Sequence, residues 1–321
     1  MLTYRFNRFF RFFHYLNLVT LKDVIVHTGR QRLPGLAAEI AFNATLSAFP
    51  AIVAMLTVVG LVGSSQETFE QLIQQLSRIA PNQVLELIER FVHEISQVSS
   101  QSLLSISFVA ALWVASGAAS AAMSALDQIH QIPPHQTRPF WKAKLVSLEL
   151  TIGTILLLIL ASTLVLISDL IVKIIANQSD QIVETIANRR HLIEPGLLRL
   201  WQRLSMPIAL GMVAIAFAFI YRFGPSRWSK GTPILPGAIL ATVFWAIFSG
   251  LFRLYVANFG NYNRVYGAVG TIIVLLLWLQ LGALTMLIGA QLNVIVGKAM
   301  RRKKQRLANS AQDRQDNASK N

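Results

Sequence analysis

Six long apolar stretches alternate with polar segments along the chain, and each is long enough to cross a bilayer as a helix. We place these spans at about 36–62, 102–125, 145–172, 204–222, 236–258 and 267–297. Residues 150–167 and 268–297 contain no charged side chain. Because unpaired backbone groups are costly in hydrocarbon, such runs must be helical. The pattern predicts an all-α, polytopic membrane protein with six transmembrane helices in a membrane domain covering 35–298.

Amphipathic patterns occur outside the spans. Residues 65–100 repeat apolar side chains at helical spacing on both sides of Ala80-Pro81, which predicts two helices in an outer loop that caps the bundle. Within the N-terminal segment 1–34, the first 16 residues place leucine and phenylalanine on one helical face beside arginines. This favours an interfacial helix, with a frayed aromatic-basic tail as the alternative. The basic stretch 299–321 is expected to be a disordered tail.

Charge orients the predicted bundle. The chain has a net charge of +14, yet only 14% of its residues are charged, against about 25% in soluble domains. Most of its 29 basic residues lie in the N-terminal segment, the loops after the second and fourth spans, and the tail. The positive-inside rule then places both termini in the cytoplasm, which requires an even number of spans. Anionic lipid headgroups, rather than nucleic acid, are the expected partners of this charge.

Ionisable residues inside spans are costly and therefore mark candidate sites. They are Glu39, Glu149, Asp169 and Arg253. Glu39 is followed by Asn43 on the same helical face. Asp169 and Arg253 both lie near the outer side, where each side chain either reaches water or pairs with the other.

Uncharged polar residues and small residues also occur within the spans. The last span carries the amides Gln280, Gln291 and Asn293, which either join helices or line a polar cavity. Small residues recur every four positions in the second span (Ser116, Ser120, Ser124) and in the fifth (Ala238, Thr242, Ala246, Gly250). Close helix packing is the default interpretation of both stripes, and a pathway lined by hydroxyl groups is the alternative.

The segment between the fifth and sixth spans is rich in turn-forming and aromatic residues. Its notable members are Asn258, Phe259, Tyr262, Asn263, Tyr266 and Gly267. Asparagine and glycine favour tight turns, and tyrosine suits the membrane interface. We expect a connecting turn at the outer mouth, with a binding re-entrant loop as the alternative.

Nothing in the sequence points to an enzyme. The chain contains no cysteine, its six histidines are scattered, and no phosphate-binding loop or nucleophile elbow is present. His130 and His135 share a loop, but two histidines without a third ligand are weak support for a metal site. We therefore expect no catalytic residue, no metal and no cofactor.

Three blocks resemble the YihY/BrkB family of bacterial inner-membrane proteins. They are Ala37–Pro50 (AAEIAFNATLSAFP), Trp113–Trp141 (WVASGAASAAMSALDQIHQIPPHQTRPFW) and Tyr221–Val294, with YRFGP, LPGA, LYVANFGNYNRVYGAVG and GAQLN. The resemblance covers about 30–297. It implies a bacterial plasma-membrane protein linked to envelope integrity and to export of lipids or solutes. The family usually has an acidic residue where Gln291 stands, and an aromatic residue near Gln280 and at Asn43.

Two functions follow from these patterns. The first is a transporter or exporter of lipid or small solute that works without its own ATPase. The second is a non-transporting envelope scaffold that organises lipids or partner proteins. The family's earlier label as a transfer-RNA-processing ribonuclease is disfavoured, because such an enzyme needs a carboxylate or histidine cluster in water. Homo-oligomers and envelope partners are left open.

Overall fold

The computed structural model describes residues 12, 15, 17–62, 81–96, 106–157, 160, 194–227, 232–258 and 262–318. Over these residues the chain forms helices and one short 3-10 turn, with no strand, so the predicted all-α class is confirmed for this part. The helices are α2 (Leu18–Arg30), α3 (Leu33–Val62), α5 (Asn82–Ser96), α6 (Ile106–Ile129), α8 (Glu194–Phe223), α9 (Leu235–Asn258) and α10 (Tyr262–Ala318). Residues 140–157 are also helical and are called the 140–157 helix below.

The observed helices overlap the predicted spans, and the count of six membrane crossings stays a prediction. Five predicted spans overlap α3, α6, α8, α9 and α10, and the 140–157 helix overlaps the first part of the third. Among the described residues, two segments have the length and composition of a membrane span, Leu235–Ala257 and Val269–Lys303. Pro207–Phe223 is a shorter apolar helix.

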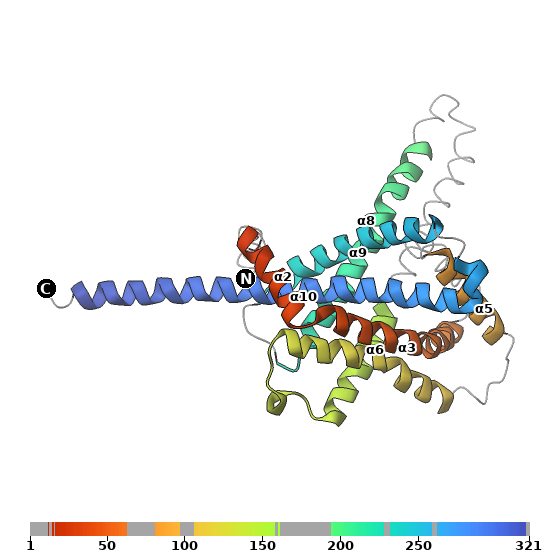
Figure 1. The fold of residues 1–321 in the computed structure, drawn as a ribbon, viewed down its shortest axis with the longest axis horizontal. Helices are drawn as coiled ribbons and strands as arrows, with labels where there is room; N and C mark the ends of the chain where they lie inside the picture. The colour runs from red at the N-terminus through yellow and green to blue at the C-terminus, as the bar shows by residue number, and fades with distance from the viewer. Residues whose placement is uncertain are drawn as a thin grey trace, which may run out of the picture.

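The long helix α10 is the axis of the bundle. Figure 1 shows α10 running through the molecule and continuing past the other helices to the C-terminus. The main core lies around its middle third, where side chains of α3, α6, α8 and α9 meet it. Many of these core residues are alanines, so the helix axes approach closely.

One close approach of the helix backbones is at Gly289 of α10. A Cβ atom there would lie 2.6 Å from the carbonyl oxygen of Gly237 in α9 and 2.6 Å from the hydroxyl of Tyr221 in α8. That hydroxyl donates a 2.6 Å hydrogen bond to the carbonyl of Met286. Only glycine fits where these three helices converge.

The loop 65–100, predicted to lie on the outer side, is helical where it is described. Pro81 precedes α5, as the sequence predicts for the second of the two amphipathic helices. Val84 and Leu85 of α5 pack against α9 and α10 through Phe252 and Trp278. This contact is that of a cap at the end of the bundle opposite the C-terminus (Figure 1). The first predicted helix of the loop lies outside the described residues.

The C-terminal stretch differs from the expected disordered tail. The helix α10 continues without a break to Ala318. Residues 299–318 contain neither glycine nor proline and are rich in alanine, lysine, arginine and glutamine, which favour helix. Since the stretch extends an existing helix, it avoids the cost of nucleation, and this outweighs its polarity.

The segment before α10 also differs from expectation. Asn258 ends α9 and Tyr262 begins α10, so Tyr262, Asn263, Tyr266 and Gly267 have helical backbones instead of forming a turn. Turn preferences of asparagine and glycine are weak compared with propagation of a long helix. Phe259 lies outside the described residues.

At the N-terminus, the structure shows a helix that the pattern did not single out. Helix α2 is capped by Asn17, whose side-chain oxygen accepts a 2.9 Å hydrogen bond from the backbone N–H of Thr20. The interfacial helix predicted over the first 16 residues lies almost entirely outside the described residues.

Candidate functional site

The predicted polar residues of the first and third spans lie on the bundle surface. Glu39 and Glu149 are exposed. Asn43 is half-buried, and its side-chain nitrogen donates a 2.9 Å hydrogen bond to the backbone carbonyl of Glu39, not to the carboxylate. The i, i+4 pair is therefore a link within α3.

The predicted pair of Arg253 and Asp169 is not tested by the described residues. Arg253 is exposed on α9. Asp169 lies outside the described residues, so an Arg253–Asp169 pair stays a prediction.

Asn293 joins the last two helices. Its side-chain oxygen accepts a 3.0 Å hydrogen bond from Gly237 N–H, and its nitrogen donates a 3.0 Å bond to the carbonyl of Ile234. Ile234 directly precedes α9 and has no polar side chain to cap it, so Asn293 caps α9 from α10. A Cβ atom at position 237 would collide with Asn293, which explains the glycine.

The two other amides of α10 differ from Asn293. Gln291 is 1% exposed, and its side-chain oxygen has no hydrogen-bond partner among the described residues. Gln280 is half-buried. Neither these amides nor the ionisable residues above are among the lining residues of the cavity described next, so their pathway role stays a prediction.

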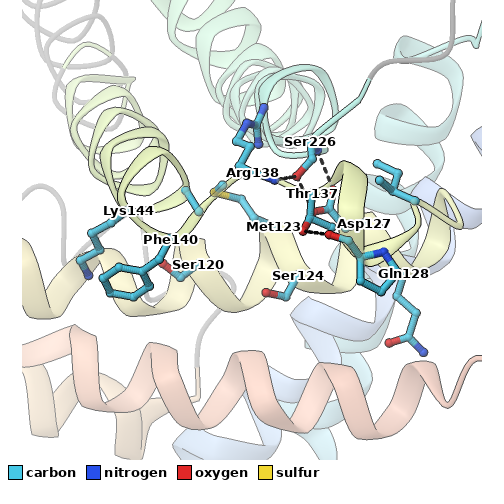
Figure 2. Close-up of a pocket in the computed structure, with 13 residues that line it drawn as sticks. Ser120, Met123, Ser124, Asp127, Gln128, Thr137, Arg138, Phe140, Lys144 and Ser226 are labelled. Carbon is cyan, nitrogen blue, oxygen red and sulfur yellow. Dashed lines mark hydrogen bonds between the residues drawn. The ribbon is translucent and has the colours of Figure 1, made fainter.

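A cavity of about 530 Å³ lies elsewhere, between the C-terminal half of α6, the following loop and the 140–157 helix. Ser120 and Ser124 line it from α6, and Phe140 and Lys144 line it from the 140–157 helix. Figure 2 shows Lys144, Phe140 and Ser120 at one end and Asp127, Arg138 and Ser226 at the other. The hydroxyl stripe of the second predicted span therefore faces a cavity at two of its positions.

The small residues that each follow one of these serines on α6, Gly117, Ala121 and Ala125, pack against other helices. A Cβ atom at Gly117 would lie 3.4 Å from the Ser47 hydroxyl and 3.6 Å from the Asn43 oxygen, both on α3. Ala121 and Ala125 are buried in the main core. One edge of α6 thus packs against α3, while the adjacent edge lines the cavity.

One end of the cavity is a network centred on Ser226. The carboxylate of Asp127 accepts two 2.6 Å hydrogen bonds, from the backbone N–H and the hydroxyl of Ser226. The Ser226 hydroxyl accepts a 3.2 Å bond from the backbone N–H of Arg138. The C-terminus of α6 is thereby tied to the segment that follows α8.

Arg138 completes that end of the cavity. Its guanidinium donates hydrogen bonds to the carbonyls of Phe223 (3.1 Å), Gly224 (2.6 Å) and Pro225 (2.9 Å). These carbonyls lie at and just beyond the C-terminus of α8, where cations are stabilised by the helix dipole. The planar, multiply donating side chain suits this role better than lysine would.

Lys144 lies at the other end of the cavity. Its ammonium donates hydrogen bonds to the Ser116 hydroxyl (2.6 Å) and to the carbonyl of Trp113 (2.8 Å), and lies 4.5 Å from the centre of the Trp113 ring. Beside it, Phe140 and Trp141 are exposed and make an edge-to-face contact with centroids 5.4 Å apart. Hydroxyl groups, a cation and exposed aromatic rings together suit an amphipathic ligand with an anionic head.

A buried titratable group, His130, directly follows the end of α6. Burial lowers the pKa of His130 below its usual 6.5, and the charges of Lys298 and Arg301 add to this effect. A hydrogen bond with the carbonyl of Leu126 and the charge of Asp127 act in the opposite direction. The net effect favours the neutral form of the imidazole.

Sequence reasoning missed Asp127, Arg138 and Ser226 as a unit. Asp127 and Ser226 are 99 residues apart, and the acceptors of Arg138 are backbone carbonyls. The one signal was that Arg138 lies in TRPFW and that Gly224-Pro225 lie in YRFGP, in two of the three family blocks. Among the described residues, no three histidine, aspartate or glutamate side chains are grouped as metal ligands.

Comparison with known proteins finds one family model and several relatives that match this chain. The family model described as "Virulence factor BrkB" matches residues 24–315. A putative ribonuclease-like protein, YfkH, of Bacillus subtilis is 28% identical over 273 residues, covering 85% of this chain and 92% of the relative. A UPF0761 membrane protein of Alteromonas mediterranea is 36% identical over 94 residues, or 29% of this chain and 32% of the relative.

A UPF0761 membrane protein of Xanthomonas axonopodis pv. citri is 38% identical over 86 residues, 27% of this chain and 20% of the relative. No solved structure matches. The family model covers most of the chain. The blocks that carry the family resemblance contain Arg138 and its partner Gly224, and also Asn293 and its partner Gly237. The chain belongs to the BrkB family of membrane proteins.

Proposed function

We propose that this chain is a six-span protein of the bacterial inner membrane that transports a lipid or a small solute without an ATPase of its own. The observation that carries the proposal is the cavity lined by Ser120 and Ser124, with the cation of Lys144 and the exposed ring of Phe140 at its edge. A hydroxyl-lined cavity beside apolar surface accommodates a polar head and lets an apolar chain remain in lipid.

The charge pattern supports an inward-facing cavity. Arg138, Lys142 and Lys144 lie in or beside the loop after α6, and Arg222 and Arg227 lie where α8 ends. Lys298 of α10 reaches the same end, donating a 2.8 Å hydrogen bond to the Gln131 side chain. By the positive-inside rule this end faces the cytoplasm, so both termini are cytoplasmic and substrate enters from the inner leaflet or the cytosol.

Flux measurements on the purified chain in liposomes test the proposal. We expect transport of fluorescent lipid or of solute above that of empty liposomes, and its loss in Ser120→Leu and Ser124→Leu, which fill the cavity. Ala110→Leu places the same side chain on an exposed position of α6 and is the matched control. Absence of transport by the wild-type chain across lipids and solutes would refute the proposal. Unchanged transport by both serine variants would exclude this cavity as the route.

An envelope scaffold is the second candidate, and one observation favours it. Helix α10 projects beyond the bundle as a continuous helix to Ala318, where it offers a surface to partner proteins (Figure 1). Cross-linking in cells and co-purification, with and without residues 304–318, test this role. A chain whose partners are the same after truncation, or that always purifies alone, contradicts it.

The proposal includes no enzymatic activity. The relative YfkH carries a ribonuclease-like name. Incubating RNA with the purified chain tests the point, using material from a host that lacks its main ribonucleases. RNA cleavage that co-purifies with the chain to homogeneity would overturn this part of the proposal.

A further inference from the structure

Helix α2 exposes a row of large apolar side chains. Leu18, Leu21 and Ile25 are 85%, 50% and 64% exposed and are spaced so that they lie on one side of the helix. A short helix with such a row in water would gain by burying it. The row therefore needs a covering surface.

Helix α2 packs against α10 at the level of Leu292 and Val296, near the end of the apolar part of α10. Thr20 and Val24 are its buried residues, and Val24 packs in one cluster with Leu292 and Val296 of α10. The apolar part of α10 ends at this level. The next residues of α10 are strongly basic: Lys298, Arg301, Arg302 and Lys303. In addition, the Lys303 ammonium lies 5.8 Å from the ring centre of Tyr15.

The positions around α2 divide into three sides at about 100° per residue. Thr20 and Val24 form the buried side, on which Val24 packs against α10. Leu18, Leu21 and Ile25 form a second side, roughly 110° further round. Asp23 lies almost opposite this second side, on the third, which it shares with Arg30 and the exposed Val19 and Val26. A helix lying in the plane of a membrane surface beside a transmembrane helix needs this division into protein, lipid and water sides.

We propose that α2 is an interfacial helix whose Leu18–Leu21–Ile25 row is seated in a lipid leaflet containing anionic lipid. Charge complementarity identifies this occupant. Lys22 and Arg30 of α2 and the four basic residues of α10 lie at the membrane boundary, against the single acid Asp23. Clusters of basic residues just outside a membrane span attract anionic headgroups. The inference is independent of whether the cavity transports a substrate.

The natural absence of cysteine allows a direct test. Leu18→Cys, Leu21→Cys, Ile25→Cys and Asp23→Cys are labelled one at a time with an environment-sensitive fluorophore. The labelled full chain is placed in nanodiscs of phosphatidylcholine, with or without 30% phosphatidylglycerol (about one lipid in three, enough for a strong surface potential). We expect a blue-shifted emission and quenching by lipid-borne quenchers at the first three positions. The Asp23→Cys label should respond to aqueous iodide instead.

A second set of measurements tests whether basic residues attract anionic lipid to α2. We expect phosphatidylglycerol to increase the quenching of the Leu21→Cys label by lipid-borne quenchers. The double change Lys22→Gln and Arg30→Gln should remove that increase. Salt at 0.5 M should remove it too, because it shortens the Debye length to roughly 4 Å. Equal exposure of all four labels to iodide would overturn the proposal. So would Leu21→Cys cross-links between copies of the chain, which would show a second copy as the occupant. No response to phosphatidylglycerol would overturn the anionic-lipid assignment.

Discussion

The two hydrogen bonds of Asn293 make a quantitative prediction. Replacing Asn293 with leucine keeps the side-chain size but removes both the acceptor for Gly237 N–H and the donor to the carbonyl of Ile234. Gly237 is buried and Ile234 is half-buried, so water does not fully replace either bond.

The magnitude follows from these burials. A buried N–H left without a partner costs about 1–3 kcal/mol. The Ile234 carbonyl keeps a 3.2 Å hydrogen bond from the Ala238 N–H, so the loss of its second bond costs about 0.5–1.5 kcal/mol. We therefore expect Asn293→Leu to lower the free energy of unfolding by roughly 2–4 kcal/mol. This exceeds the ~1 kcal/mol of an ordinary cap on an exposed helix, because the site is removed from water.

The assay is reversible unfolding in mixed micelles of a mild detergent and dodecyl sulfate, followed by circular dichroism. The matched control is Gln291→Leu, two residues earlier on the same helix. The Gln291 oxygen is buried without a partner among the described residues, so its removal should leave stability unchanged or raise it. Equal destabilisation by both changes would refute the reasoning, because the loss would then reflect any buried amide and not the hydrogen bonds.

Three further predictions use the same assay. Gly289→Ala should destabilise the protein by at least about 1–3 kcal/mol through overpacking at the meeting point of three helices, whereas Gly250→Ala, with open space around it, should be neutral or slightly stabilising. Arg138→Lys should lose most of the contacts to the end of α8 and destabilise by about 1–3 kcal/mol; wild-type stability would show that these carbonyls are hydrated instead. Because the pKa of His130 is lowered in the fold, its stabilising contribution is complete above pH 6.5 and is lost as the pH falls below that value, so His130→Gln should lose less stability than wild type between pH 7.5 and 5.

Much of the helical pattern was predictable because burial in lipid or protein imposes long apolar runs. The starts of α3, α5 and α9 lie within three residues of the predicted positions, each next to a proline that favours a helix start. The end of α10 was not predictable in the same way. Polarity distinguishes what lies in lipid, but it does not decide whether a stretch attached to a preformed helix remains helical.

The cavity network was beyond single-sequence reasoning for a physical reason. Arg138 binds backbone carbonyls, which every residue carries, so its partners leave no trace in residue type. Asp127 is a single polar residue near a helix end, and only the fold brings Ser226 beside it. Conversely, Asn293 stood out in an apolar run, and its partner Gly237 lies in the LPGA block.

The family blocks acquire a structural meaning from these contacts. Ser47 of the first block donates a 3.0 Å hydrogen bond to the carbonyl of Val114 in the second. Arg138 of the second block reaches Gly224 in the third. The blocks therefore contain contacts that join helices distant in the sequence. When a substitution in a block abolishes activity, loss of the fold has to be distinguished from loss of a functional group.

Helix α10 has a mechanical consequence. Its 57 residues form one proline-free rod of about 86 Å, of which about 30 Å lies beyond Lys298. Such a rod acts as a lever whose fulcrum is the crowded crossing at Gly289. A tilt of about 10° there would move the C-terminal tip of the helix by roughly 5–8 Å, so a small change among the packed helices becomes a displacement large enough for a partner protein to sense.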